Sequence, residues 1–312
     1  MSSAPPVRPP VEKKEEYSDV REDLPPEVID PARSAADVSL EQIAPDWLGP
    51  RAIVLHGVFG PEECKSVMQY FEGCNVTEKC MARTDYRNNY RVSVQNEAVA
   101  AAIFARIRPF LPDTEVVDES TGEFYANEGL GMRGSWKPVG LNPCFRVCKY
   151  DPDGHFGPHC DSDYVRDLNH RSLKTFMIYL NDDYGGGTTN FLAPHELHYD
   201  EATKRFAAPA SAVRAALKAR QGDALIFDHN ILHEGGTVAD GFKYIMRCEV
   251  MYERQPEDRS MLSDEDRAAR EREDRALELL WQAQQLEASR REMEAVELYR
   301  RAFKLCPHLE RA

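Results

Sequence analysis

Short apolar runs separated by polar turn residues fill the part of the chain from residue 142 to residue 253. The runs are rich in aromatic and β-branched residues, which suit the pleated, half-buried surface of a strand. Glycine, aspartate and asparagine occupy the intervals between them. This texture predicts an all-β barrel or jelly roll. The strand-like runs are "CFRVCKY" (144–150), "SLKTFMIYLND" (172–182), "TTNFL" (188–192), "GDALIFD" (222–228) and "FKYIMRCEVMY" (242–252).

The segment ahead of this region has a mixed pattern. The apolar run Ile53 to Leu55 predicts a strand, and Gly60-Pro61 then opens a predicted helix that carries Val67, Met68, Tyr70 and Phe71. "NEAVAAAIFARIRPFLP" (96–112) predicts a second helix, which Pro109 and Pro112 end. Residues 1–35 contain seven prolines and few apolar side chains, which is typical of a disordered tail. We therefore expect one main domain over residues 36–254, with its barrel core over 142–253.

Residues 255–312 are highly charged and strongly helical in pattern. Ser263 with Asp266 predicts a capped helix start, and Pro307 a helix end. The plain interpretation is a solvated helical hairpin. The tail also resembles a single tetratricopeptide unit, because small, large and terminating residues fall at that repeat's positions. One repeat does not bury its own apolar face, so it must pack on the barrel, pair with another chain or bind a protein partner. The matching residues are Ala283, Leu286, Ala295, Tyr299, Ala302 and Pro307.

Charge and composition narrow the class of protein. The formal net charge is -14, which opposes nonspecific binding to a phosphate backbone, so nucleic acid is not an expected partner. No run approaches the roughly 20 apolar residues that cross a bilayer, and the first residues lack the apolar stretch of a secretory signal. The eight cysteines are scattered, and we expect reduced thiols rather than disulfides. We expect a cytoplasmic or nuclear protein without membrane attachment.

The stretch "HFGPHCDSDYV" (155–165) gathers two histidines, two acids and a cysteine. On an extended strand, side chains two residues apart point to the same face. His159 and Asp161 can therefore converge on one ion, while Cys160 points away. His155 is separated from them by Pro158, which prevents a helix that would align the two histidines. A histidine at the end of a later strand, His229 or His233, can supply a third ligand. Two histidines and one carboxylate leave open positions, as in non-haem Fe(II) oxygenases.

With these motifs in place, residues 52 to 253 resemble the prolyl 4-hydroxylase-like group of the 2-oxoglutarate- and Fe(II)-dependent dioxygenases. Three stretches occur in that family's order and approximate spacing: "FRVCKYDPDGHFGPHCD", "RSLKTFMIYLNDDYGGGTTNFL" and "HEGGTVADGFKY". The resemblance implies an α+β, mainly β fold. Its core is a double-stranded β-helix (jelly roll), flanked by N-terminal helices and, in this chain, by a C-terminal helical hairpin.

The resemblance also implies roles for individual residues. His159, Asp161 and His233 match the metal ligands. Lys243, ten residues after His233, matches the cation that anchors the far carboxylate of 2-oxoglutarate, with Arg247 as a rival because a guanidinium grips a carboxylate with two hydrogen bonds. Tyr150 and Tyr179 match hydroxyl-bearing positions that line the cosubstrate pocket in that family. The segment "YRNNYR" (86–91) resembles one that borders the substrate groove, and Arg91 and Arg146 are candidates for substrate or structural contacts. His155 is interpreted as a loop histidine beside the site, and Asp163 as a residue next to its mouth.

The activity that the resemblance implies is hydroxylation of a prolyl residue in a protein or peptide. Fe(II), 2-oxoglutarate and O2 are the implied cofactor and cosubstrates, with succinate and CO2 as co-products and ascorbate as a supporting reductant. Two alternatives belong to other classes. One is a catalytically silent barrel that serves with its helical tail as an interaction module. The other is a zinc hydrolase that uses His155, His159 and Asp161.

Overall fold

The computed structural model describes residues 20–74, 86–117, 132–201, 205–257, 260, 263–307 and 309. Of the predicted tail over residues 1–35, residues 1–19 lie outside the described part, whereas the rest is described and buries Leu24. The chain divides into two compact units. The first comprises residues 1–111, 140–163 and 172–251, and the second comprises residues 112–139, 164–171 and 252–312. The boundaries predicted at residues 35 and 254 stay predictions.

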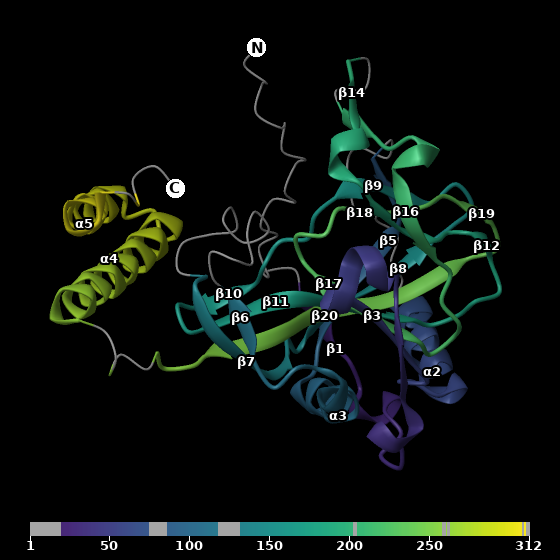
Figure 1. The fold of residues 1–312 in the computed structure, drawn as a ribbon. Coiled ribbons are helices and arrows are strands. Elements are labelled where there is room, and N and C mark those ends of the chain that lie inside the picture. Colours follow the sequence, from purple (N-terminus) through teal and green to yellow (C-terminus); the bar gives the residue numbers. More distant parts are fainter. Residues whose placement is uncertain are drawn as a thin grey trace. The chain divides into compact units, whose positions relative to one another are not determined.

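The larger sheet of the first unit contains the longest strands (Figure 1). The central strand 144–150 is covered on both faces. Successive residues of a strand point to opposite faces, and here almost all of them are buried. Burial on both faces explains why these strands read as near-continuous apolar runs. In spatial order the strands are β1 (Val20–Asp23), β5 (Tyr90–Gln95), β8 (Cys144–Tyr150), β20 (Lys243–Arg254), β11 (His170–Tyr179), β17 (Ala224–Asp228), β3 (Ala52–His56) and β2 (Ser39–Gln42).

A second, smaller sheet faces the site described below. Its strands, in spatial order, are β16 (Val213–Leu217), β13 (Thr189–Leu192), β18 (His233–Gly235), β9 (His155–His159) and β4 (Arg87–Asn88). Along the chain, the strands alternate between the two sheets. β8, β11, β17 and β20 belong to the larger sheet, and between them the chain enters the smaller sheet as β9, then as β13 and β16, and then as β18. This alternation between two sheets makes the double-stranded β-helix, as predicted. Two short ladders complete the unit: β12 (Gly185–Gly186) with β19 (Val238–Asp240), and β14 (His198–Asp200) with β15 (Arg205–Ala207).

Helices of the first unit follow the sequence signals. The helix α2 (Pro61–Gly73) starts at Gly60, whose backbone N–H donates to the Glu63 carboxylate across 2.7 Å. Asn96 caps α3 (Glu97–Ile107) by accepting from the Val99 amide across 2.9 Å. The predicted second helix thus ends just before the proline-containing turn, as its prolines require. The remaining helices are α1 (Pro45–Leu48) and the 3-10 turns Pro26–Val28, Ala35–Asp37, Gly49–Arg51, Arg108–Phe110, Pro194–Glu196 and Ala210–Ala212.

The second unit contains the C-terminal hairpin, α4 (Asp264–Ala288) and α5 (Glu292–Leu305), together with β6 (Glu115–Val117), β7 (Gly134–Leu141) and β10 (Val165–Asp167). Ser263 caps α4 by accepting from the Asp266 amide. Leu168 packs against the apolar seam between the two helices, so the hairpin does not bury its face alone. The seam is made by Ala276, Leu277, Leu279, Leu280, Ala302, Cys306 and Leu309. Binding of a partner by this hairpin stays a prediction.

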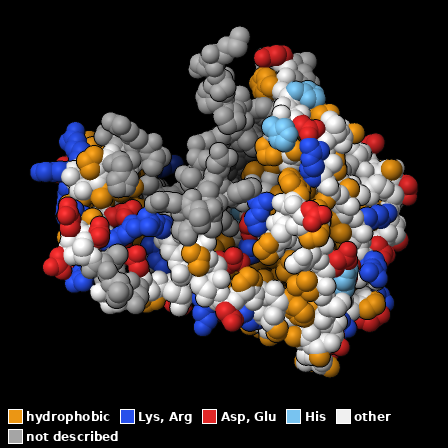
Figure 2. Space-filling view, viewed as in Figure 1, with side chains coloured by type: hydrophobic (Ala, Val, Ile, Leu, Met, Phe, Trp, Pro, Cys, Tyr) orange, Lys and Arg blue, Asp and Glu red, His pale blue; other side chains and the backbone are white. Residues whose placement is uncertain are grey.

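The predicted fold class is confirmed: a mainly β jelly-roll core, flanking N-terminal helices and a C-terminal helical pair. On the face that Figure 2 shows, acidic and basic side chains are interspersed over the described surface. No helix among the described residues is long and apolar enough to span a membrane.

Candidate metal centre and pocket

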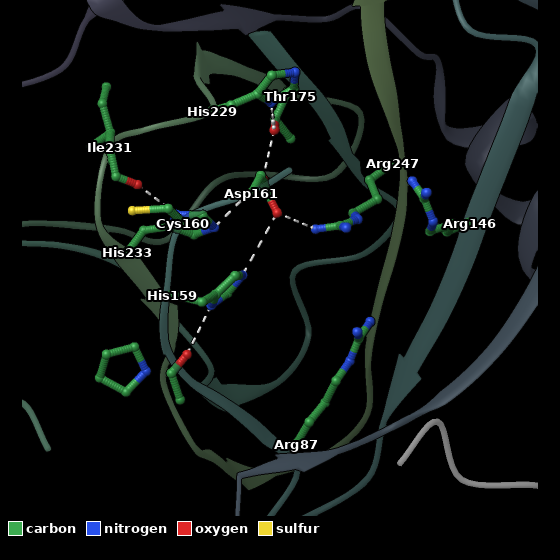
Figure 3. Close-up of polar contacts among 12 residues, drawn as sticks. Arg87, Arg146, His159, Cys160, Asp161, Thr175, His229, Ile231, His233 and Arg247 are labelled. Carbon is green, nitrogen blue, oxygen red and sulfur yellow. Dashed lines mark hydrogen bonds and ion pairs between the residues drawn. The ribbon is translucent and has the colours of Figure 1, made fainter. Parts of the chain in front are cut away.

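Three ligand-type side chains meet between the two sheets of the first unit. His159 ends β9, Asp161 follows two residues later, and His233 begins β18, where strand pairing sets it opposite His159. Their ligand atoms all lie within 4.8 Å of one another, and all three side chains are buried. Figure 3 shows the two imidazoles and the carboxylate pointing toward a common centre. The structure thus brings together the three residues that the sequence selected.

Hydrogen bonds fix how the two histidines face this centre. Nδ1 of His159 lies 2.8 Å from the Gly157 carbonyl oxygen, and Nδ1 of His233 lies 2.8 Å from that of Ile231. Because a carbonyl only accepts, each Nδ1 carries the proton and each Nε2 keeps its lone pair. Both Nε2 atoms lie 3.7 Å from an oxygen of Asp161, too far for a hydrogen bond. Lone pairs that face one another in this way fit a divalent cation, and backbone-bound Nδ1–H groups are typical of metal-binding histidines.

Asp161 is held at both oxygens. Arg247 donates from Nη1 to Oδ1 across 2.7 Å, and the Thr175 hydroxyl donates to Oδ2 across 2.5 Å. Burial alone would raise the pKa of this carboxyl, but the Arg247 guanidinium and the neighbouring histidines hold the pKa well below its usual value. The carboxylate is therefore ionised and oriented at neutral pH, as a metal ligand must be.

A pocket that is partly open to solvent is lined by the three ligands and by Lys243. Lys243 is 4% exposed, and its Nζ donates to the Gly187 carbonyl across 2.7 Å. Among the described residues, no carboxylate lies within ion-pair distance of Nζ. Burial consequently lowers the pKa of Lys243 to about 8. The pocket thus has metal-type ligands at one end and a buried cation at the other.

Two tyrosines predicted to accompany the cation lie close to it. The Nζ atom of Lys243 is 5.7 Å from the ring centroid of Tyr150 and 5.4 Å from that of Tyr179. Tyr150 lines the pocket, whereas the Tyr179 hydroxyl shares a 2.7 Å hydrogen bond with the Thr189 hydroxyl, which lines it. Burial raises the pKa of the Tyr179 hydroxyl, so this group stays protonated. It can orient the Thr189 oxygen toward the cavity.

Other residues named from the sequence lie elsewhere. Arg146 pairs with Glu249 across 2.5 Å, both side chains are buried, and neither lines the pocket. Arg91 sits on β5 opposite Cys148, half-buried and outside the pocket lining. His155 bonds through Nδ1 to the Asp153 carbonyl and does not belong to the ligand group. The structure therefore does not assemble the set His155, His159 and Asp161 that a zinc hydrolase would need.

His229, the rival third ligand, is buried behind Asp161 rather than beside it. Its two ring nitrogens bond to the hydroxyls of Ser172 and Thr175, and burial lowers its pKa. Cys160 points away from the ligand group, toward the Asn230 carbonyl. Strand alternation had assigned that direction to Cys160 correctly.

Arg87 and Thr175 line the pocket, although neither was predicted from the sequence as a site residue. Arg87 is 1% exposed and lines the pocket. Its guanidinium carbon lies 4.3 Å from the ring centroid of Phe156, and its Nε donates to the side-chain oxygen of Asn89. Thr175 also lines the pocket. Thr175 was accessible from the sequence, because it lies four residues before Tyr179 on one strand and therefore shares its face. Arg87 lies in the segment 86–91 that resembles a border of the substrate groove, but only Arg91 was singled out there.

Residues 145–248 match the family model of the 2OG-Fe(II) oxygenase superfamily. No curated protein matches the chain. Among solved structures, the chain is similar to a viral collagen prolyl hydroxylase from Paramecium Bursaria Chlorella virus-1 (18% identity, 65% of this chain and 96% of that chain, TM-score 0.37). It is also similar to a Pseudomonas putida prolyl-4-hydroxylase (14% identity, 69% of this chain and 98% of that chain, TM-score 0.41). A third similar structure is that of a Trichoplax adhaerens prolyl hydroxylase in complex with a hypoxia inducible factor oxygen degradation domain peptide fragment (13% identity, 71% of this chain and 91% of that chain, TM-score 0.38).

Proposed function

We propose that this protein, whose residues 145–248 match the family model of the 2OG-Fe(II) oxygenase superfamily, is a dioxygenase that hydroxylates a side chain of a protein, foremost a prolyl residue. One observation carries the proposal: a single pocket contains a two-histidine, one-carboxylate ligand group at one end and a buried lysine at the other. The first suits Fe(II) and the second suits the far carboxylate of a dicarboxylic acid.

The ligand group fits Fe(II) by its donor chemistry. His159 and His233 present Nε2 lone pairs, Asp161 presents an ionised carboxylate, and these three would hold the metal. Bound there, iron would supply the oxygen chemistry in which 2-oxoglutarate and O2 give succinate and CO2 while the second oxygen atom enters a substrate C–H bond. The chain itself contributes ligand geometry, cosubstrate binding and exclusion of water.

Lys243 would bind the far carboxylate of 2-oxoglutarate. A buried ammonium is costly when none of the described residues places a carboxylate beside it, and a dicarboxylate that enters the pocket would supply the counter-charge. Thr189, oriented by the Tyr179 hydroxyl, and Tyr150 lie beside this end to add hydrogen bonds. The pocket walls are partly apolar, which would limit water at the reacting centre once the cosubstrate is bound. These walls include Phe156, Met177, Phe227 and Ile245.

The prolyl substrate is supported by the resemblance of three sequence stretches to the prolyl 4-hydroxylase-like group, and a need for ascorbate rests on the same resemblance. The test is mass spectrometry of proline-containing peptides incubated with protein, Fe(II), 2-oxoglutarate and O2. We expect a product heavier by one oxygen atom, located on proline by fragmentation. If the oxygen atom is found on another residue type, the protein is still a hydroxylase, but the assignment of proline as its substrate residue is wrong.

Variants separate the rival functions. Asp161→Ala should abolish product, whereas His155→Ala should leave it unchanged because His155 lies outside the ligand group. Loss of activity in His155→Ala, together with hydrolysis supported by zinc without oxygen uptake, would favour the hydrolase. Absence of 2-oxoglutarate turnover with every peptide and metal would favour the silent interaction module.

A further inference from the structure

A chain of buried hydrogen bonds leads from Asp161 away from the pocket. The Thr175 hydroxyl lies 2.5 Å from Oδ2 of Asp161 and 2.9 Å from Nδ1 of His229, and Nε2 of His229 lies 2.8 Å from the Ser172 hydroxyl. Exposure is 4% for Thr175, 1% for His229 and 0% for Ser172. Figure 3 shows Thr175 and His229 behind the carboxylate, on a different side from Arg247.

The direction of each hydrogen bond follows from the donors available. An ionised carboxylate only accepts, so the single hydroxyl proton of Thr175 goes to Asp161. The Thr175 oxygen must then accept from Nδ1–H of His229. This direction is the same for a neutral and for a protonated imidazole. In the neutral form Nε2 accepts from the Ser172 hydroxyl, and every group of the chain is satisfied.

The backbone reinforces the same contact. The Asp161 amide donates to the carbonyl oxygen of His229 across 2.9 Å. Asp161 lies in the loop after β9, whereas Ser172 and Thr175 belong to the long strand β11. The side chain of Asp161 is therefore tied to the central strand β11 through Thr175. Its main chain is tied to the same strand through His229, whose amide donates to the Leu173 carbonyl across 3.3 Å.

We propose that Thr175 and His229 are positioning residues that hold the Asp161 carboxylate toward His159 and His233. The inference rests on the proposed function, since it concerns the metal ligand of that site. Oδ1 is fixed by the Arg247 guanidinium and Oδ2 by Thr175, so the carboxylate has one donor on each oxygen. His229 acts through Thr175 by fixing which way the hydroxyl points. Outer hydrogen-bond partners of metal ligands typically contribute about 10- to 100-fold in metal affinity.

The test is calorimetric titration of the metal-free protein with Mn(II), without 2-oxoglutarate or oxygen, in matched pairs of variants. Thr175→Val keeps the volume but removes the hydroxyl, and we expect a dissociation constant raised about 10- to 100-fold. Thr175→Ser keeps the hydroxyl and should stay within about threefold of the wild type. His229→Leu should weaken binding, whereas His229→Asn, which places an amide donor near the Nδ1 position, should recover part of the affinity.

The outcomes are distinguishable from failure of the proposed function. If the wild type binds Mn(II) and Asp161→Ala does not, the metal site stands. If Thr175→Val then binds as tightly as the wild type, the positioning role is overturned. If the wild type binds no divalent ion, the proposed function fails instead. Near-ultraviolet circular dichroism of each metal-free variant checks folding; should Thr175→Val not fold, Thr175→Ala and the His229 pair decide the question.

Discussion

Arg247 donates from Nη1 to Oδ1 of Asp161 across 2.7 Å, which places its guanidinium at the metal-ligand end of the pocket. Lys243 precedes it by four residues on β20 and lies on the same face of the strand. Four residues of strand span about 13 Å, so the two cations serve different ends of the cavity. The structure thus separates the two residues that the sequence had left as rivals for one role.

Replacing Lys243 by methionine should raise the apparent KM for 2-oxoglutarate roughly 10- to 100-fold, because a hydrogen-bonded charge pair is worth about 1.5–3 kcal/mol. Steady-state succinate formation at varied 2-oxoglutarate measures this. Arg247→Met should instead raise the Fe(II) concentration needed for half-maximal rate. If Arg247→Met had the larger effect on the 2-oxoglutarate KM, the anchor assignment would be reversed. Lys243→Met should cost little stability, because it removes a buried ammonium that has no carboxylate partner among the described residues.

The pKa of Lys243, about 8 in the protein without ligand, predicts a pH dependence of cosubstrate binding. The protonated ammonium is the binding form, so affinity is full below pH 8 and falls as pH rises through that value. We expect kcat/KM for 2-oxoglutarate to decline above about pH 8 while kcat changes less. Lys243→Arg provides the control, since a guanidinium stays charged. An equal decline in that variant would assign the pH dependence to another group.

Arg146 and Glu249 form a buried pair that also includes Asn142, whose side-chain amide donates to Glu249 across 2.7 Å. Removing one partner leaves an uncompensated buried charge, and Arg146→Ala should lower the free energy of unfolding by about 3–5 kcal/mol. Urea denaturation measures this loss. Arg146→Met with Glu249→Leu should recover much of it. A fully stable Arg146→Ala variant with weakened peptide binding would instead support the groove role predicted from the sequence.

Much of the fold was accessible from local pattern. The run "CFRVCKY" coincides with β8, and Pro109 marks the end of α3 to within two residues, because apolar runs and proline act locally. The structure brings His159 and Asp161 together and turns Cys160 away, as the alternation argument predicted, although β9 ends at His159 and Asp161 lies in the loop that follows. These features depend only on residues close together in the chain.

Features that depend on long-range geometry were not accessible. Arg87 and Arg91 lie four residues apart, yet Asn89 separates two strands that enter different sheets, so only Arg87 reaches the pocket. Alternation cannot reveal a change of sheet. Likewise, His229 and His233 both follow β17, and only the pairing of β18 with β9 brings His233, not His229, opposite His159. Lys243 and Arg247 share a strand face, and the loop that carries Asp161 decides which one it contacts.

The central claim is that the group His159, Asp161 and His233 binds an iron that consumes 2-oxoglutarate. Succinate formed from 2-oxoglutarate in the presence of Fe(II) and O2 tests it most directly, with wild type, His233→Ala and His229→Asn assayed side by side. We predict turnover in the wild type, none in His233→Ala, and measurable turnover in His229→Asn. Turnover that survives His233→Ala but is lost in His229→Asn would contradict the account.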